Sequence, residues 1–317
     1  MSLGTLTRGL FGRRHWMTTV AFLLLIAAVA MPRVILPRDT FSYIVTFDIT
    51  QSMDVEDVAL NGAPVSRLVF ARAAMRDAMG QLPCGSKVGW SVFTGQRTLL
   101  LLAPVEVCGN FDALLSSLDQ IDWRMRWTNW SRIAEGGIYS ATRVAQDVGQ
   151  GAAVVFVTDG QEAPPVLPSD ALKRDINPAQ VKGWLIGVGG DQAAPVPRSD
   201  ADGNRDGYWQ AEDVIQVPPQ PGSGTQAESH EELSELRGHY LAVVAGQIGF
   251  GYRRLLGAAS MSDALLDARF GHREAVPTDL RWCPALLALF LLVLRFAPEF
   301  ASARRRVAGR RANSSYV

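Results

Sequence analysis

The sequence predicts an α/β domain built on a doubly wound, mainly parallel sheet and flanked by two transmembrane helices. Three observations support this fold class. Apolar runs with few charges lie near both ends of the chain. Between them, short apolar segments have the character of strands that are buried on both faces. Helical patterns alternate with these segments, as they do in a sheet covered by helices on both sides.

The first apolar run, residues 16–36, contains only Arg33 as a charged residue and is long enough to cross a bilayer. Arginines are concentrated before it, so the positive-inside rule places residues 1–15 in the cytoplasm. A cleaved signal peptide is the alternative, because Ala-Val-Ala at residues 28–30 resembles a cleavage site. Under both interpretations the domain that follows is exported.

The second apolar run, residues 282–294, is shorter. Arg281 and Arg295 at its ends can extend their charged groups toward the membrane surface, so a span is expected over residues 280–298. The basic tail, residues 299–317, then lies in the cytoplasm. A buried core helix followed by a basic tail is the alternative.

The segments between the two runs predict the order of strands and helices. Strands are expected at residues 43–47, 88–93, 98–102, 153–157 and 181–188, with helices at residues 66–79, 111–118 and 133–147. A helix near residues 231–247 and a strand near residues 251–255 continue the sheet. Residues 191–225 are rich in Pro, Gly and Asp and too long for a simple connection, so we expect them to form an insertion in a domain spanning residues 41–270.

Composition excludes several classes of protein. Lysine plus arginine and aspartate plus glutamate both number 31, which argues against electrostatic binding of nucleic acid. Hydrophobic residues make up 48% of the chain, which excludes a disordered chain. The three cysteines form no CxxC pair and there are only four histidines, so neither a zinc site nor a disulfide scaffold is predicted.

Polar side chains follow two of the predicted buried strands. Asp48, Thr50 and Ser52 follow the first strand, and Asp159 follows the fourth. In a doubly wound sheet these strand ends can be neighbours, and carboxylate and hydroxyl oxygens suit a hard cation such as Mg²⁺. Taken separately, either motif is more typical of an ordinary turn that ends a strand.

Together the two loops resemble the von Willebrand factor A (VWA) domain and its metal-ion-dependent adhesion site (MIDAS). The family pattern is an Asp-x-Ser-x-Ser loop, a Thr farther along the chain, and an Asp in a Thr-Asp-Gly turn. Thr50 departs from the pattern but keeps a hydroxyl. The resemblance implies that Asp48, Thr50, Ser52 and Asp159 belong to a site for a divalent cation, for which Mg²⁺ is expected and Ca²⁺ or Mn²⁺ are alternatives.

The middle ligand of the predicted site has two candidates. Aligning residues 131–136 with the Thr-x-Ile-x-x-Gly stretch of the family puts Ser131 at the Thr position. Thr128 lies three residues earlier and is the alternative. Ser131 can also act as the N-cap of the helix that begins near Arg132, and both roles can coexist.

The family resemblance implies a binding module rather than an enzyme, because the open metal position is usually filled by an acidic residue of a protein partner. The chain contains no nucleophile-elbow, P-loop or zinc-protease motif. Asp54, Glu56 and Asp57 follow the first loop, where they either strengthen the negative field around a cation or form a solvated edge.

Four segments resemble a narrower group, the MxaL-type membrane proteins that accompany bacterial methanol dehydrogenases; they are residues 48–53, 82–89, 103–108 and 157–165. The resemblance implies a two-span protein of the bacterial inner membrane with a periplasmic VWA domain. It also implies a role in maturing a periplasmic quinoprotein dehydrogenase, including calcium insertion, beside other VWA membrane proteins and a MoxR-type ATPase. The alternative is a structural, stress-tolerance component of a Bat-type membrane complex.

Two further features lie outside this site. Asp202, Asn204, Asp206 and Asp213 fit the pattern of a calcium-binding loop, although such clusters are also found in hairpin turns. Cys84 and Cys108 lie at equal distances from a turn near Gln96, on either side of a predicted antiparallel strand pair. In-register pairing would bring them to the same end, so an exported domain predicts a disulfide, with two free buried thiols as the alternative.

Overall fold

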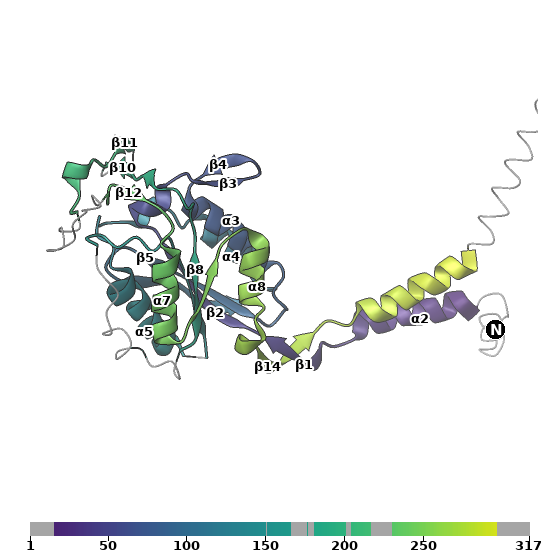
Figure 1. Ribbon diagram of the computed structural model, residues 1–317. Coiled ribbons are helices and arrows are strands. Elements are labelled where there is room, and N and C mark those ends of the chain that lie inside the picture. The colour runs from purple at the N-terminus through teal and green to yellow at the C-terminus, as the bar shows by residue number, and fades with distance from the viewer. Residues whose placement is uncertain are drawn as a thin grey trace, which may run out of the picture. The chain divides into compact units, whose positions relative to one another are not determined.

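The computed structural model describes residues 16–149, 151–165, 176, 181–200, 204–216 and 230–296. The chain divides into two compact units. One unit combines Met1–Pro37 with Ala275–Val317, and the other is Arg38–Glu274 (Figure 1). Residues 1–15, the tail at 299–317 and part of the predicted insertion lie outside the described residues.

The larger unit is built on a six-stranded sheet in the order β13, β8, β7, β2, β5, β6. The strands are β2 (Ser42–Asp48), β5 (Lys87–Phe93), β6 (Thr98–Glu106), β7 (Ala153–Thr158), β8 (Gly183–Gly187) and β13 (Gly251–Arg254). All neighbours are parallel except β6, which runs antiparallel to β5 at the edge. The predicted strands and the mainly parallel sheet are therefore confirmed.

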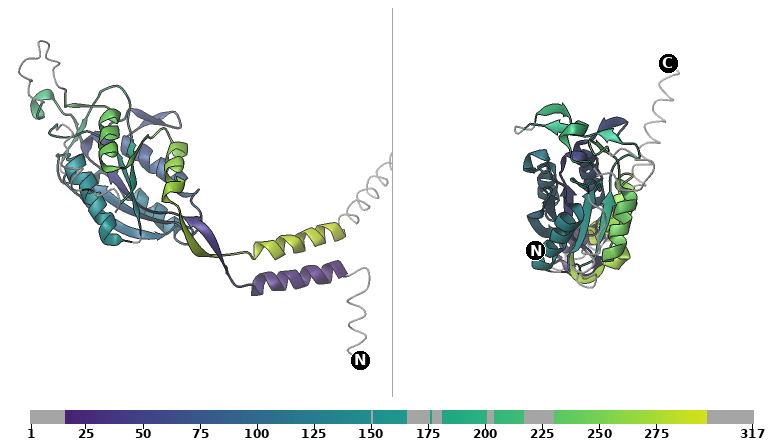
Figure 2. Two further views of the ribbon diagram at one scale, coloured as in Figure 1. Left: turned by 60° about the horizontal axis from the view of Figure 1, so that its bottom comes forward. Right: turned by 60° about the vertical axis from the view of Figure 1, so that its left-hand side comes forward.

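Helices cover both faces of this sheet (Figures 1 and 2). They are α3 (Arg67–Met79), α4 (Phe111–Asp119), α5 (Tyr139–Val148), α7 (Gly238–Ile248) and α8 (Ala258–Leu265). Successive side chains of β2 point to opposite faces of the sheet, so the hydrophobic core has two parts. Tyr43, Val45 and Phe47 pack with α3, α4 and α8 on one face. Ile44 packs instead with α5 and α7 on the opposite face. This arrangement is the doubly wound architecture that the sequence predicts.

Shorter elements surround the carboxyl ends of the strands. A helical turn, Gln51–Asp54, follows β2, and a π-helical turn, Ile133–Ile138, precedes α5. Three small two-stranded sheets pair β3 (Val58–Leu60) with β4 (Ala63–Val65), β9 (Ala194–Pro195) with β12 (Leu233–Ser234), and β10 (Pro197–Ser199) with β11 (Arg205–Tyr208). The described part of the insertion thus contains a hairpin.

The smaller unit contains two helices, α2 (Trp16–Ala30) and residues 282–296, which lie side by side (Figure 2). The expected span at residues 16–36 needs correction. Helix α2 ends at Ala30, and residues 34–36 belong to strand β1 (Val34–Thr40), which pairs with β14 (His272–Thr278). Among the described residues, no helix has the length and apolar character needed to cross a membrane. The expected second span, residues 280–298, extends beyond them.

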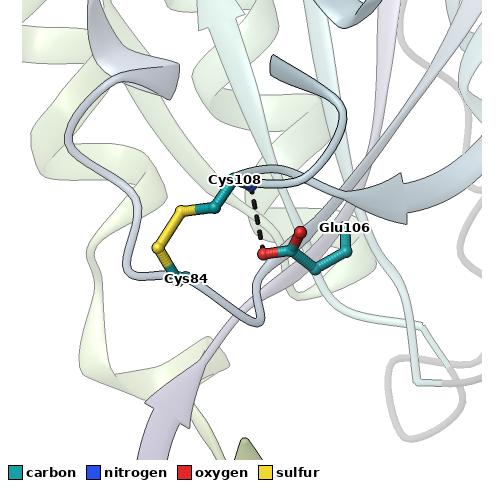
Figure 3. A group of neighbouring side chains, drawn as sticks. All are labelled: Cys84, Glu106 and Cys108. Carbon is teal, nitrogen blue, oxygen red and sulfur yellow. Dashed lines mark hydrogen bonds between the residues drawn. A yellow bond between two sulfur atoms is a disulfide. The ribbon is translucent and has the colours of Figure 1, made fainter. Parts of the chain in front are cut away.

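A disulfide joins Cys84 and Cys108, whose Cα atoms are 5.3 Å apart (Figure 3). Pairing of β5 with β6 sets Lys87 opposite Glu106, which brings the two cysteines to the same end of the strand pair. The Glu106 carboxylate accepts hydrogen bonds from the amides of Gly85, Cys108 and Gly109 at 2.8, 3.1 and 2.6 Å. The two sulfurs lie near this carboxylate, but the disulfide leaves no thiolate to bind a metal.

Candidate metal site

The first predicted ligand, Asp48, ends strand β2 and is fully buried. Its Oδ1 atom accepts hydrogen bonds from the backbone amide of Thr50 at 2.9 Å and from the Thr50 hydroxyl at 2.7 Å. Its Oδ2 atom accepts a hydrogen bond from the Thr158 hydroxyl at 2.6 Å. Because β2 and β7 are parallel neighbours, the loops that follow them meet at this carboxylate.

Three hydroxyl side chains line one pocket of about 310 Å³ beside this carboxylate. They belong to Thr50, Ser52 and Ser131. The hydroxyl oxygens of Thr50 and Ser52 are 3.3 Å apart. The Ser131 hydroxyl is buried and has no hydrogen-bond partner in the part of the chain that the structure describes. A buried polar group without a partner is costly, so its presence in this pocket suits a ligand that supplies the missing interaction.

Backbone contacts fix the position of Ser131. Its amide and carbonyl both pair with Ala163 at 2.8 Å, and the next amide, that of Arg132, donates to the carbonyl of Gly95 at 2.7 Å. Gly95 has a φ of +100°, and a Cβ atom there would lie 2.0 Å from the carbonyl oxygen of Trp130. Only glycine permits this close approach.

The structure distinguishes between Ser131 and Thr128, the two candidates for the middle ligand, and between the two roles expected for Ser131. The helical turn after Ser131 is capped by Glu162, whose carboxylate accepts from the amides of Ile133 and Ala134 at 3.1 and 3.0 Å. The N-cap role expected for Ser131 is therefore wrong. Thr128 does not line the described pocket, and its hydroxyl accepts from the amide of Trp130 at 3.2 Å. Sequence reasoning missed the capping role of Glu162, which no local pattern indicates.

Asp159 does not line the pocket, and an arginine binds its carboxylate. Its Oδ2 atom accepts from the guanidinium of Arg67 at 2.6 Å and from the Ser234 hydroxyl at 3.3 Å, while Oδ1 accepts from the amide of Gln161 at 2.9 Å. The structure therefore brings Asp159 near the other predicted ligands but commits its carboxylate to a salt bridge.

Arg67, at the start of α3, connects the loops of the site. Its guanidinium donates to both oxygens of Asp57, to the carbonyl of Ser52 at 3.3 Å, and to the carbonyl and hydroxyl of Ser234 at 3.0 and 2.7 Å. The side chain is fully buried. Sequence reasoning missed Arg67, because an arginine in the first turn of an amphipathic helix is usually solvated.

The electrostatics of the site favour an added cation. Burial, followed by the negative charge of Asp159, raises the pKa of Asp48. Burial also opposes ionisation of Asp57, but the hydrogen bonds and charge of Arg67 outweigh it and lower the pKa of that carboxyl. When all are ionised, the carboxylates of Asp48, Asp57 and Asp159 outnumber the single positive charge of Arg67, and the buried Glu162 adds a further carboxyl to the pocket lining. This excess of negative charge suits a cation.

The acidic residues that follow the first loop are paired individually. Asp54 contacts Arg126 at 2.9 Å, and Glu56 contacts Arg205 at 3.3 Å. With Asp57 bound to Arg67, a purely solvated edge is wrong for this segment.

The predicted calcium loop lies on the hairpin of the insertion, and Asp202 falls outside the described residues. The amide of Asn204 donates to the carboxylate of Asp200 at 2.7 Å. Asp206 and Asp213 approach the guanidinium of Arg198 at 3.7 and 3.5 Å. The described part of this segment thus has the hairpin geometry of the alternative interpretation, and calcium binding stays a prediction.

We compared the chain with known proteins, and the similarities found are to solved structures. No protein-family model and no curated protein matches the chain. An aerotolerance-related membrane protein from Bacteroides fragilis is similar with a TM-score of 0.51 and 20% identity, over 71% of this chain and 96% of that one. BatB from Bacteroides thetaiotaomicron has a TM-score of 0.48 and 20% identity, over 71% and 94%. A von Willebrand factor type A structure from Catenulispora acidiphila has a TM-score of 0.38 and 11% identity, over 82% and 46%.

The first of these similarities shows that the chain shares its fold with the Bacteroides fragilis protein. The mixed α/β body with a central, mostly parallel sheet is consistent with the VWA or Rossmann-like class. At this identity the comparison shows the fold alone. Function has to be argued from the site.

Proposed function

We propose that this protein is a membrane-anchored, metal-dependent protein-binding module and a component of a Bat-type membrane complex. One observation carries the proposal. The hydroxyls of Thr50, Ser52 and Ser131 line one pocket, and the Ser131 hydroxyl is buried without a partner among the described residues. The Asp48 carboxylate does not line this pocket but accepts the hydrogen bond of the Thr50 hydroxyl. Oxygen atoms with an uncompensated negative charge behind them suit a hard divalent cation.

In this proposal Thr50, Ser52 and Ser131 hold the cation, and Asp48 supplies negative charge through its hydrogen bond to Thr50. Asp159 does not bind the cation directly in this proposal, because its carboxylate forms a salt bridge with Arg67. Mg²⁺ is the proposed ion, with Ca²⁺ or Mn²⁺ as alternatives. The bound cation leaves a coordination position for an acidic side chain of a partner. We propose that the activity is binding rather than catalysis, as the family resemblance implies.

A membrane anchor is supported by the two helices of the smaller unit. Large apolar side chains are exposed along both, including Phe22, Ile26 and Val29 on α2 and Leu289 and Phe290 on the other. Such surfaces are unfavourable in water and favourable in lipid. We propose two anchors in the bacterial inner membrane, with both chain ends in the cytoplasm and the larger unit in the periplasm.

The Bat-type role is preferred because the Bacteroides fragilis protein of the same fold is an aerotolerance-related membrane protein. In this role the partners are other VWA membrane proteins and a MoxR-type ATPase. Maturation of a periplasmic quinoprotein dehydrogenase, including calcium insertion, is the second candidate. It is supported by the resemblance of segments such as residues 48–53 and 157–165 to MxaL-type proteins.

The test is capture of partners from native membranes by the full-length, detergent-solubilised chain, with and without a chelator. VWA membrane proteins and the ATPase should be captured only when a divalent ion is present and Asp48 is intact. Thr128→Ala is the matched control and should behave as the unmodified chain does. Capture of a quinoprotein dehydrogenase instead would favour the second candidate. Equal capture in chelator and by Asp48→Ala would refute metal-dependent binding.

A further inference from the structure

We propose that the pocket at the metal site recognises an acidic residue with a bulky apolar neighbour, and that the insertion binds the apolar side chain. This inference rests on the proposed function, because the acidic residue binds through the cation. It adds the chemistry of the partner segment, which follows from the apolar residues that line the pocket.

The pocket is lined by two kinds of side chain. Thr50, Ser52 and Ser131 contribute hydroxyls. Apolar side chains also line it, and they belong to Trp130, Pro164, Pro165, Trp209, Val214 and Ile215. A volume of about 310 Å³ is at the lower end of the range for ligand pockets. A water occupies about 30 Å³, so a hydrated cation fills only part of this space.

The insertion is fixed against the metal loop. The indole nitrogen of Trp209 donates a hydrogen bond to the side-chain oxygen of Gln51, the residue before Ser52. The guanidinium of Arg198 lies over the Trp209 ring at 5.5 Å and also contacts Asp213. Trp209 is therefore held on two sides, and it presents a preformed apolar wall next to the hydroxyls.

Exposure at the rim shows which surface a partner would cover. Trp130 is 50% exposed and Ile215 is 66% exposed, and both belong to the pocket lining. Large apolar side chains that gather beside a polar site are typical of recognition surfaces. A bulky apolar side chain seated between them would remove this surface from water.

Charge determines the other half of the recognised motif. The pocket lining includes Glu162, Asp213 and Glu231, and no lysine or arginine is among the lining residues of the described chain. The pocket lining therefore offers no positively charged side chain to an acidic peptide, so binding of the peptide carboxylate depends on the metal ion. Apolar contact alone would not select an acidic residue, so the two interactions have to act together.

The experiment uses the full-length chain in lipid nanodiscs with Mg²⁺ and three fluorescein-labelled peptides. Their central sequences are Phe-Asp-Phe, Gly-Asp-Gly and Phe-Asn-Phe, and binding is measured by fluorescence anisotropy. The first peptide should bind at least tenfold more tightly than either of the others. Ile215→Ser should remove the preference for phenylalanine and leave Mg²⁺ affinity unchanged, and Trp209→Ala should remove the same preference. Tyr208→Ala is the control, because Tyr208 is adjacent and exposed but does not line the pocket.

The outcomes separate this inference from the proposed function. Equal, Mg²⁺-dependent binding of both aspartate peptides would overturn the inference and leave the metal-dependent module intact. Equal binding of Phe-Asp-Phe and Phe-Asn-Phe would show that the carboxylate is not recognised, and would also overturn the inference. Absence of Mg²⁺ binding by calorimetry would refute the proposed function itself.

Discussion

The guanidinium of Arg67 lies 2.6 Å from the carboxylate of Asp159, and neither side chain is exposed to solvent. Removing two charges from water is expensive, so such a pair persists only when the remaining hydrogen bonds of both groups are satisfied. Here Asp57, Ser52 and Ser234 satisfy them. Arg67 thus acts as an internal cation that holds the loops of the candidate site together.

The first prediction concerns this pair. Arg67→Met should lower the free energy of unfolding by about 3–5 kcal/mol, because it leaves Asp57 and Asp159 buried without a counter-charge. Urea denaturation followed by circular dichroism measures the change. Arg76→Met is the matched control on the same helix, since its pair with Asp119 is solvent-exposed and should contribute little. Similar stability of both variants would contradict the role assigned to Arg67.

The second prediction concerns pH. Because the folded-state pKa of Asp48 is raised, the folded protein binds this proton more tightly than the unfolded chain does. Without metal, ionised Asp48 therefore lowers stability as pH rises from its ordinary pKa through the raised value. Asp48→Asn should be more stable than the unmodified protein in EDTA at pH 8, with a smaller difference at pH 4.

Thermal unfolding at both pH values, with EDTA or with Mg²⁺, measures this effect. Mg²⁺ should raise the Tm of the unmodified protein, because the ion binds the folded state, and it should not change that of Asp48→Asn. Equal stabilisation of the two proteins by Mg²⁺ would place the ion elsewhere.

The third prediction separates stability from affinity at Ser131. Its hydroxyl is buried without a partner in the described structure, so Ser131→Ala should leave the metal-free protein equally stable or slightly more stable. The same change should weaken Mg²⁺ binding by roughly tenfold or more, which is the scale seen when groups around a metal are removed. Calorimetry checks the affinity, with Thr128→Ala as the unaffected control. Lower stability with unchanged affinity would indicate a structural role only.

The fourth prediction concerns the hydroxyl at Thr50. Thr50→Ser should retain Mg²⁺ binding because it keeps both the ligand oxygen and the hydrogen bond to Asp48. Thr50→Val has a similar shape but lacks the oxygen, so it should lose most of the affinity. Calorimetry on the two variants provides the comparison. Equal binding would exclude Thr50 as a ligand.

The fifth prediction concerns the disulfide, whose cysteines are 24 residues apart in the sequence. Replacing both Cys84 and Cys108 with serine should lower the free energy of unfolding by about 3 kcal/mol in the chain-entropy description. Thiol labelling of the unfolded, unreduced chain should modify Cys283 alone, since it is the free cysteine. Three labelled thiols would contradict the disulfide.

The part of the site that depends on strand order was predictable from the sequence. Asp48 ends one buried apolar segment and Asp159 follows another, and parallel neighbours bring such ends together. The same reasoning gave the paired cysteines, because their positions follow from the register of adjacent strands. These features require only periodicity and the rules of sheet topology.

The rest depends on contacts that no local pattern encodes. Arg67 and Ser234 are 167 positions apart, and their hydrogen bond exists only after the whole sheet is assembled. The salt bridge between Asp159 and Arg67 could not be predicted from the sequence for the same reason. Strands β1 and β14 were also missed, because residues 34–36 follow an apolar helix and resemble its continuation.

The pairing of β1 with β14 has a consequence for how the domain can be handled. The chain enters the larger unit through one strand of this pair and leaves through the other, so the two points of passage are neighbours. A short linker across them would close the domain into a ring. New ends could then be opened at the turn formed by Asn61 and Gly62, which connects β3 and β4 at positive φ. Such a circular permutant would keep the sheet, the disulfide and the metal loops while changing only where the polypeptide begins.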